Sequence, residues 1–166
     1  ASNYLIEHGH KRIALLLGPQ DSTANQDRLR GVLAAIEDAH LSIPEKNIFR
    51  GDQTRESGRS FANSIAASQI PYTALFISNN PMAVGAANRL RELGYHIPND
   101  ISIICFDNSP LVEDGGLSLT TVGYDPYPMG IAAAEALAKR IKAPEGSKTQ
   151  LYFLPHIICR SSVKGI

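Results

Sequence analysis

The chain has 166 residues, with 16 Lys and Arg against 16 Asp and Glu, and 43% of its residues are hydrophobic. This length and composition predict one globular domain and exclude a collagen, a disulfide-rich scaffold and a disordered tail. No apolar run approaches the roughly 20 residues of a membrane-spanning helix, and balanced charge without a basic stripe argues against nucleic-acid binding by this chain alone. The two cysteines occupy unrelated positions, which favours a reducing, cytoplasmic environment.

Glycine, proline and short polar clusters divide the chain into alternating helical and extended segments. In chain order, we expect a helix over residues 1–8, a strand over 13–17, a helix over 26–40, a strand over 47–50, a helix over 57–68, a strand over 73–78, a helix over 81–93, a strand over 101–106, a short extended segment over 119–122, a helix over 126–142 and a final extended segment over 151–160. Short buried strands that alternate with helices predict an α/β fold, with an open parallel sheet and helices on both of its faces.

The helix that begins at Pro81 has the clearest local signals. Asn80 can accept a hydrogen bond from a free N–H of the first turn, so we expect it to be the N-cap, and proline suits the first helical position. Gly94 then ends the helix.

Polar residues follow four of the predicted strands, at residues 18–21, 52–53, 79–80 and 107–108. Ligands of open parallel sheets bind beyond the carboxyl ends of the strands. Asp107 can accept hydrogen bonds from adjacent hydroxyls, and Asn79 can donate and accept. Arg28, in the predicted helix over 26–40, presents a planar set of donors. These residue types suit a neutral, hydroxyl-rich ligand, on whose apolar face Tyr124 could stack. The alternatives are turn or capping roles for Asn79 and Asp107, a solvated helix charge for Arg28 and packing for Tyr124.

Signals for catalysis or cofactor binding are absent from the sequence. It has no G-x-G-x-x-G after the first strand, no phosphate-binding G-x-x-x-x-G-K-[ST], no G-x-S-x-G and no H-E-x-x-H. The five histidines do not fall at metal-ligand spacing with Cys or Asp. We therefore expect no catalytic residue, no metal and no cofactor, and we expect Cys105 and Cys159 to be inert packing residues.

Several groups of residues together match one known family. They are residues 9–14 (GHKRIA), 28–31 (RLRG), 73–74 with Asn79, 82–86 (MAVGA), 97–103 (IPNDISI), 106–108 (FDN), 119–122 (LTTV) and 160–161 (RS). In this order the chain resembles, over essentially its whole length, the effector-binding core of LacI/GalR (lactose-repressor) transcriptional regulators. The resemblance implies a periplasmic-binding-protein-like fold of type I.

The resemblance also implies site residues. Arg28, Asn79 and Asp107 match the polar ligand-binding positions of the family, and Tyr124 matches a polar position that lines the same cleft. Where the family usually has Asn-Asp, this chain has Asn79-Asn80, so that no carboxylate is available there. Gln53 stands where some sugar-binding members have a stacking aromatic residue.

By the same resemblance, the chain is a C-terminal part of such a regulator. Residues 1–122 and 151–166 would form one lobe, and the helix over 126–142 would belong to an absent N-terminal lobe. Such regulators bind DNA through a helix-turn-helix that precedes the core, so DNA would be a partner only through that missing part. The helix is expected to be mobile, repacked or docked on a neighbour, and effector binding by the isolated lobe is expected to be weak.

Homodimerisation is a further family property. Val84, Leu111 and Val112 are apolar residues at positions where the resemblance places the partner surface, although Val84 could instead pack on the sheet. The expected function is therefore effector sensing, for a sugar or nucleoside, and dimerisation in a cytoplasmic regulator without membrane contact. A periplasmic sugar-binding protein of an ABC transporter is the alternative, and an enzyme on the same sheet is a more distant one.

Overall fold

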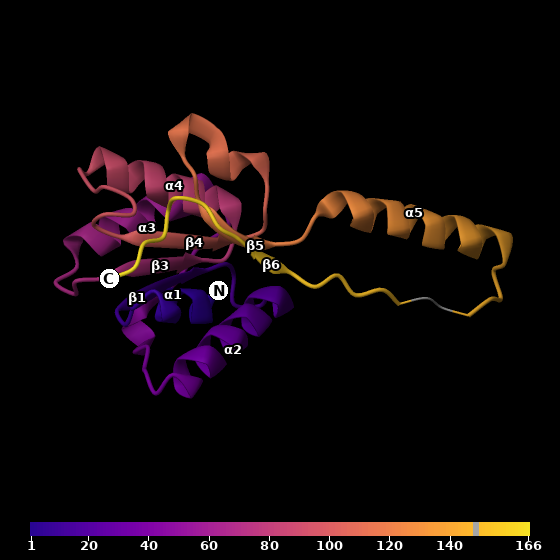
Figure 1. The fold of residues 1–166 in the computed structure, drawn as a ribbon, viewed down its shortest axis with the longest axis horizontal. Coiled ribbons are helices and arrows are strands. Elements are labelled where there is room, and N and C mark those ends of the chain that lie inside the picture. Colours follow the sequence, from indigo (N-terminus) through magenta and orange to yellow (C-terminus); the bar gives the residue numbers. More distant parts are fainter. Residues whose placement is uncertain (148–149) are drawn as a thin grey trace.

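The computed structural model describes residues 1–147 and 150–166. Within them, six strands form one sheet in the order β2-β1-β3-β4-β5-β6 (Figure 1). The strands are β1 (Ile13–Leu17), β2 (Ile48–Arg50), β3 (Ala74–Ile77), β4 (Ser102–Phe106), β5 (Thr120–Gly123) and β6 (His156–Ile158). The first five pair in parallel, whereas β6 pairs antiparallel with β5. The predicted α/β fold is confirmed, with an antiparallel edge strand that the sequence did not predict.

Helices cover both faces of this sheet, as predicted. The helices are α1 (Ser2–Glu7), α2 (Thr23–Asp38), α3 (Arg55–Ala67), α4 (Asn80–Glu92) and α5 (Pro126–Lys142), with 3-10 helices η1 (Glu45–Asn47) and η2 (Pro110–Gly116). Along β1, Leu16 faces a core cluster with residues of α3 and α4, whereas Leu15 and Leu17 face a second cluster with residues of α1 and α2. Because successive strand residues point to opposite faces, two covered faces require a continuous apolar strand such as β1.

Helices α3 and α4 pack against each other at backbone contact. A Cβ added to Gly58 would lie 2.1 Å from the backbone oxygen of Met82, and one added to Gly85 would lie 2.0 Å from the backbone oxygen of Arg55. On the outer surface of this helix pair, Glu92 accepts from Arg59 and from Arg89 at 2.7 and 2.8 Å. Hydrogen bonds from Arg59 and Arg89 lower the pKa of Glu92 to about 2.

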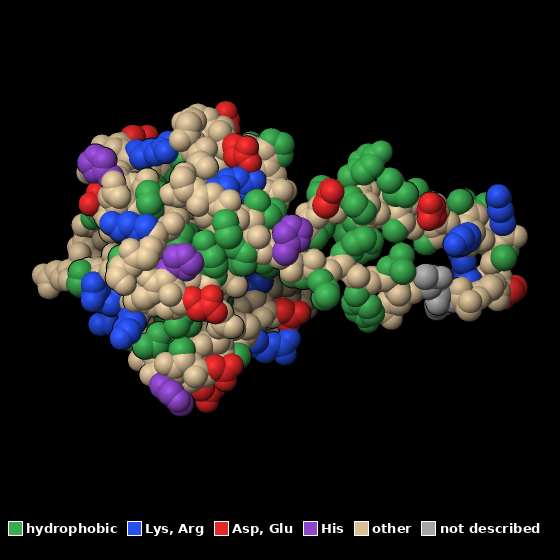
Figure 2. Space-filling model, in the orientation of Figure 1, with side chains coloured by type: hydrophobic (Ala, Val, Ile, Leu, Met, Phe, Trp, Pro, Cys, Tyr) green, Lys and Arg blue, Asp and Glu red, His purple; other side chains and the backbone are tan. Residues whose placement is uncertain are grey.

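Helix α5 covers neither face of the sheet. Figure 1 shows that it extends away from the sheet, joined to it by the segments that leave β5 and enter β6. We call α5 and its flanking segments, residues 124–147 and 150–155, the arm. No residue of α5 is buried, and Figure 2 shows apolar side chains along the arm. The exposed large apolar side chains of the arm are Tyr127, Ile131, Leu137, Ile141, Leu151, Tyr152 and Leu154.

The structure differs from the sequence predictions at several element ends. The N-cap of α4 is Asn79 and not Asn80, with Asn79 Oδ1 accepting from the Met82 N–H at 2.9 Å. Helix α2 begins at Thr23, three residues earlier than predicted, and the expected strand over 151–160 is reduced to β6. The 3-10 helix η2 was not predicted. None of the helices in the described part of the chain is long and apolar enough to cross a membrane.

Candidate ligand-binding site

The carboxyl ends of three parallel strands, β2, β3 and β4, form the candidate site. Ser78 and Asn79 follow β3, Asp107 follows β4, and Gln53 lies three residues after β2. Two of these residues have left-handed backbone, with φ of 69° at Gln53 and 70° at Asp107. Non-glycine residues rarely adopt this conformation, and where it occurs it is concentrated at functional sites.

Arg28 reaches this edge from α2. Its guanidinium lies over the ring of Phe106, 3.9 Å from the centroid, and Nη1 donates to the carbonyl oxygen of Ser78 at 2.9 Å. Burial lowers the pKa of Arg28, and the nearby groups of Asp107 and Tyr124 oppose this shift because negative charge favours the protonated guanidinium. The structure thus brings Arg28, Asp107 and Tyr124 together, each of them half-buried.

The backbone of Asp107 is fixed from several sides. Its N–H donates to the carbonyl oxygen of Val122 in β5 at 2.8 Å. The buried side chain of Asn80 lies beneath the turn: with its oxygen accepting from Ser109 Oγ at 2.9 Å, its Nδ2 donates to the carbonyl oxygens of Phe106 and Asp107 at 3.1 and 2.9 Å. Asn80 therefore supports the β4 turn instead of capping α4.

Asn79 is part of the same strand edge, but both ends of its amide are engaged within the protein. Its oxygen caps α4, and Nδ2 donates to the carbonyl oxygen of Gln53 at 3.3 Å. Asn79 therefore links the ends of β2 and β3. Its predicted role in ligand binding stays a prediction.

Sequence reasoning missed two residues that shape the site. Phe106 supplies the aromatic face beneath Arg28, and the signal was its position as the last residue of a buried strand. Ser78 accepts from Arg28 through its carbonyl oxygen, while its Oγ and Asn25 Oδ1 both accept from the Gly18 N–H, at 3.0 and 3.2 Å. The hydrogen bond from Gly18 to Ser78 links the end of β1 to the end of β3.

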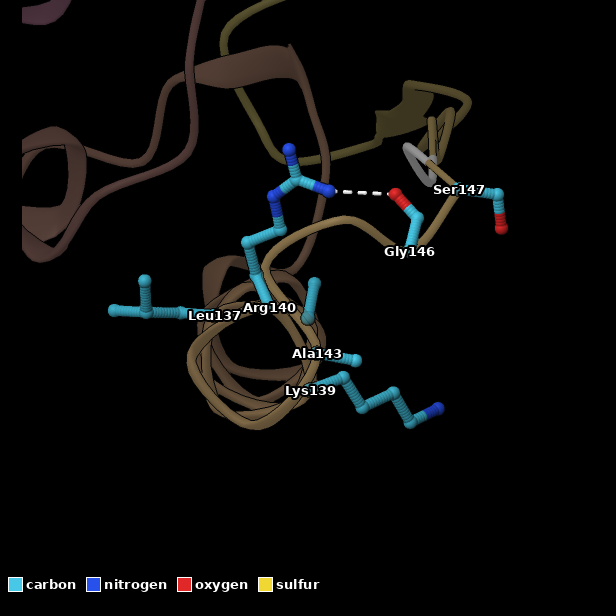
Figure 3. Close-up of a pocket in the computed structure, with 7 residues that line it drawn as sticks. Leu137, Lys139, Arg140, Ala143, Gly146 and Ser147 are labelled. Atoms are coloured by element: carbon cyan, nitrogen blue, oxygen red, sulfur yellow. Dashed lines mark hydrogen bonds between the residues drawn. The ribbon is translucent and has the colours of Figure 1, made fainter.

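Two hollows differ in their relation to these residues. One of about 270 Å3 lies beside Arg28 and Phe106, and its remaining wall comes from Ala1–Asn3, α2, Phe76 and Val122. A larger one of about 620 Å3 lies on the arm, between the last turns of α5 and the segment after it. Figure 3 shows Arg140 Nη1 donating across this second hollow to the Gly146 carbonyl oxygen at 2.6 Å. The described residues that line this second hollow all belong to the arm and not to the strand ends, so we place the candidate site at Arg28 and Asp107.

The predicted dimer residues do not form one exposed patch. Val84 and Val112 are buried in one core cluster, so the expectation that they lie at the surface is wrong: η2 packs against α4 and places Val112 in the same cluster as Val84. Leu111 is 37% exposed, and its predicted role at a dimer surface stays a prediction. Burial of the Cys105 thiol raises its pKa to about 12. Cys159 is exposed, so the expectation that it is a packing residue is wrong.

Metal binding has no support among the residues that the structure describes. They contain no group of three or more His, Cys, Asp or Glu side chains that could hold an ion.

Comparison with known proteins identifies relatives of the whole chain. A model of the periplasmic binding protein-like domain matches residues 2–163. The HTH-type transcriptional repressor PurR of Vibrio vulnificus is 36% identical over 166 residues, which is 100% of this chain and 50% of that protein. Among solved structures, a transcriptional regulator CelR–cellobiose complex has a TM-score of 0.87 at 30% identity and covers 98% of this chain and 50% of its own. A LacI-type regulator of Bacillus cereus subsp. cytotoxis has a TM-score of 0.88 at 30% identity and covers 99% of this chain and 58% of its own. The chain spans about half the length of the relatives that it matches.

Proposed function

This chain belongs to the periplasmic binding protein-like domain family, and from that premise we propose that it is the effector-sensing part of a LacI-type DNA-binding transcriptional regulator. The proposed effector is a small hydroxyl-rich molecule, a sugar or a nucleoside, that binds at the strand ends. The observation that carries this proposal is the stacking of Arg28 on Phe106 beside Asp107 and Tyr124. The activity is binding, and no catalytic step is proposed.

The chemistry of the site supports this class of ligand. A guanidinium has five N–H donors, and Arg28 uses one of them on the Ser78 carbonyl oxygen. The carboxylate of Asp107 can accept from two neighbouring hydroxyls. Hydrogen bonds to charged groups contribute about 1.5–3 kcal/mol each, so two or three of them supply much of the roughly 8 kcal/mol of a micromolar complex.

We propose that α5, the helix of the arm, belongs to a second lobe of the regulator. The exposed side chains of Leu137 and Ile141, 61% and 70% accessible, support this assignment because monomeric proteins rarely leave a contiguous apolar face uncovered. In this arrangement residues 1–122 and 151–166 form the C-terminal lobe and residues 126–142 cross to the N-terminal lobe. The effector then binds in the cleft between the lobes.

Closure of this cleft is the proposed signal. A ligand shifts an equilibrium between open and closed forms only as far as it binds one form better than the other. Groups of the second lobe must therefore complete the contacts that Arg28 and Asp107 begin. The remaining parts of the proposal are homodimerisation through the surface around Leu111, DNA binding by a part of the regulator outside this chain, and a cytoplasmic location.

A ligand panel tests the proposal. Glucose, galactose, cellobiose, adenosine and inosine are titrated by calorimetry into the longer protein that carries both lobes. At least one compound is expected to bind, and the isolated chain is expected to bind it at least tenfold more weakly. Because a charge-assisted contact contributes about 1.5–3 kcal/mol, Asp107→Asn and Arg28→Lys should each weaken binding about ten- to a hundredfold.

Asp52→Asn is the matched control. Asp52 is also a carboxylate at a strand end, but it accepts from Thr54 N–H and Oγ1 at 3.1 and 2.6 Å and has no part in the proposed site. Equal affinities for Asp107→Asn, Asp52→Asn and the unmodified protein would show that the strand ends do not bind the effector.

The alternative is a periplasmic sugar-binding protein of a transporter, which shares the fold. The regulators among the matched relatives favour the first proposal. If the panel compound changes the affinity of the longer protein for its operator DNA, the result supports the regulator. If the longer protein binds a sugar but has no affinity for DNA, the result supports the transporter.

A further inference from the structure

Arg160 connects segments of the chain that lie far apart in the sequence. It follows β6 by two residues, and its side chain is only 14% exposed. Its guanidinium donates from Nε to Glu113 Oε1 at 2.7 Å, from Nη2 to Asn108 Oδ1 at 2.8 Å, and from Nη1 to the Leu119 carbonyl oxygen at 2.9 Å and Thr121 Oγ1 at 3.2 Å. These partners belong to the loop after β4, to η2 and to β5 with the residue before it.

The backbone of Arg160 is fixed as well. Its N–H donates to Thr120 Oγ1 at 3.0 Å, and that hydroxyl donates to the Arg160 carbonyl oxygen at 3.2 Å. Arg160 is therefore held to β5 through both its backbone and its side chain. Arg160 therefore joins this strand to the loop after β4 through direct hydrogen bonds to both.

The loop that Arg160 holds begins at the candidate site. Asn108 directly follows Asp107, whose left-handed backbone turns the chain out of β4. The end of β5 touches this turn closely, because a Cβ added to Gly123 would lie 2.8 Å from the Asn108 nitrogen. A displacement of Asn108 must therefore change the orientation of Asp107.

We propose that Arg160 is a positioning residue of the ligand site, which holds Asn108 and the turn at Asp107 against β5 and β6. The proposal rests on the proposed function, in which Asp107 binds the effector and α5 belongs to a second lobe. β5 and β6 are the strands that lead into the arm (Figure 1). Arg160 thereby links the segments that move on closure of the lobes to the carboxylate that contacts the effector, although it touches no effector itself.

The test replaces Arg160 with lysine. Arg160→Lys keeps the charge, but a single ammonium cannot serve Glu113, Asn108 and the Leu119 carbonyl oxygen in the fork geometry of a guanidinium. The measured quantity is hydrogen exchange of the Asp107 amide in the 166-residue chain, with the 1H–15N shift of the Asn108 side-chain amide as a spectroscopic signature. We expect exchange at Asp107 to accelerate at least tenfold relative to the amides of β3, and the Asn108 side-chain signal to move.

Arg89→Lys is the matched control. Arg89 also contacts one glutamate and one asparagine, Glu92 and Asn63, both at 2.8 Å, but on the outer surface of α3 and α4. This variant should leave exchange at Asp107 unchanged relative to β3. If Arg160→Lys does not fold, Asn108→Ala removes one contact of Arg160 and should give the same local acceleration.

The outcomes separate the two proposals. An Asp107 amide that accelerates only in step with β3, or an unmoved Asn108 side-chain signal, would overturn the positioning role, even if a panel compound binds the protein. A panel without any binder would overturn the proposed function, whereas exchange at Asp107 requires no ligand and would still decide the role of Arg160.

Discussion

Gly58→Ala tests the backbone contact between α3 and α4. The added Cβ would lie 2.1 Å from the Met82 backbone oxygen, about 1 Å closer than carbon and oxygen atoms tolerate. A flexible side chain could rotate away, but a helix backbone cannot, so the two helices must separate. Overpacking of this kind costs about 1–3 kcal/mol and more where relaxation is blocked, so we take about 3 kcal/mol for the steric cost.

The helix propensity of alanine opposes this cost. Alanine gains up to about 1 kcal/mol over glycine inside a helix, so the net loss expected for Gly58→Ala is about 2 kcal/mol. Gly31→Ala is the matched control, since Gly31 lies inside α2 and an added Cβ would meet no atom within 4 Å. It should stabilise the chain by about 0.5–1 kcal/mol. The difference between the variants, about 3 kcal/mol, is then the steric cost alone.

Urea denaturation followed by circular dichroism measures this difference. With an m-value of about 2 kcal/mol/M, the two unfolding midpoints should differ by about 1.5 M. Unfolding of Gly58→Ala at the same urea concentration as Gly31→Ala would refute the reasoning, because it would mean that α3 and α4 adjust to a methyl group at no cost.

Three further predictions concern single side chains. Asn79→Ala should lower the free energy of unfolding by about 1 kcal/mol through loss of the α4 cap, whereas Asn79→Asp keeps the acceptor and should not; equal losses for both variants would contradict capping. Ellman's reagent should modify the exposed Cys159 but not Cys105 in the native chain and both after denaturation, because Cys105 is buried and its raised pKa keeps the thiol protonated; modification of two thiols in the native chain would contradict this. The pKa of Glu92, near 2 in the folded chain against an ordinary 4.5, contributes stability that is present above about pH 4.5 and is lost as the pH falls toward 2. Glu92→Gln should therefore flatten the acid limb of the stability profile, and an unchanged limb would exclude this contribution.

The sheet was predictable because its strands carry their own signal. Residues 13–17 and 74–77 are continuous apolar runs, as expected of strands covered on both faces. The direction of β6 was not predictable, since a short exposed strand after a long excursion can pair either way. The pairing of Val122 with Ile157 follows from the path of the arm, which the local sequence does not encode.

The misassigned cap shows where local reasoning ends. Asn79 and Asn80 are adjacent and have the same side chain, so either could cap α4. The choice depends on the carbonyl oxygens of Phe106 and Asp107, which are 26 or more residues away in sequence and engage the amide of Asn80. The sequence marked Arg160 only as part of a motif shared with the family, and its contacts were missed for the same reason: its side-chain partners lie 39–52 residues away.

The burial of the predicted dimer residues has a comparable cause. Val84 and Val112 are apolar in sequence, and apolar character alone does not distinguish a core contact from a partner contact. The 3-10 helix η2 decides between them, because it packs against α4 and brings Val112 into the same core cluster as Val84. Its proline and paired glycines, Gly115 and Gly116, read locally as an open loop.

The left-handed turn at Asp107 restricts how position 107 can evolve. Aspartate, asparagine and glycine accept a φ of 70° at low cost, whereas β-branched and bulky residues do not. Mutation at this position can therefore exchange the carboxylate for an amide or remove the side chain, whereas a β-branched side chain would strain the main chain. In the proposed site, a change of ligand specificity is therefore expected at positions such as 28 and 124, because the backbone at Asp107 restricts which side chains can stand there.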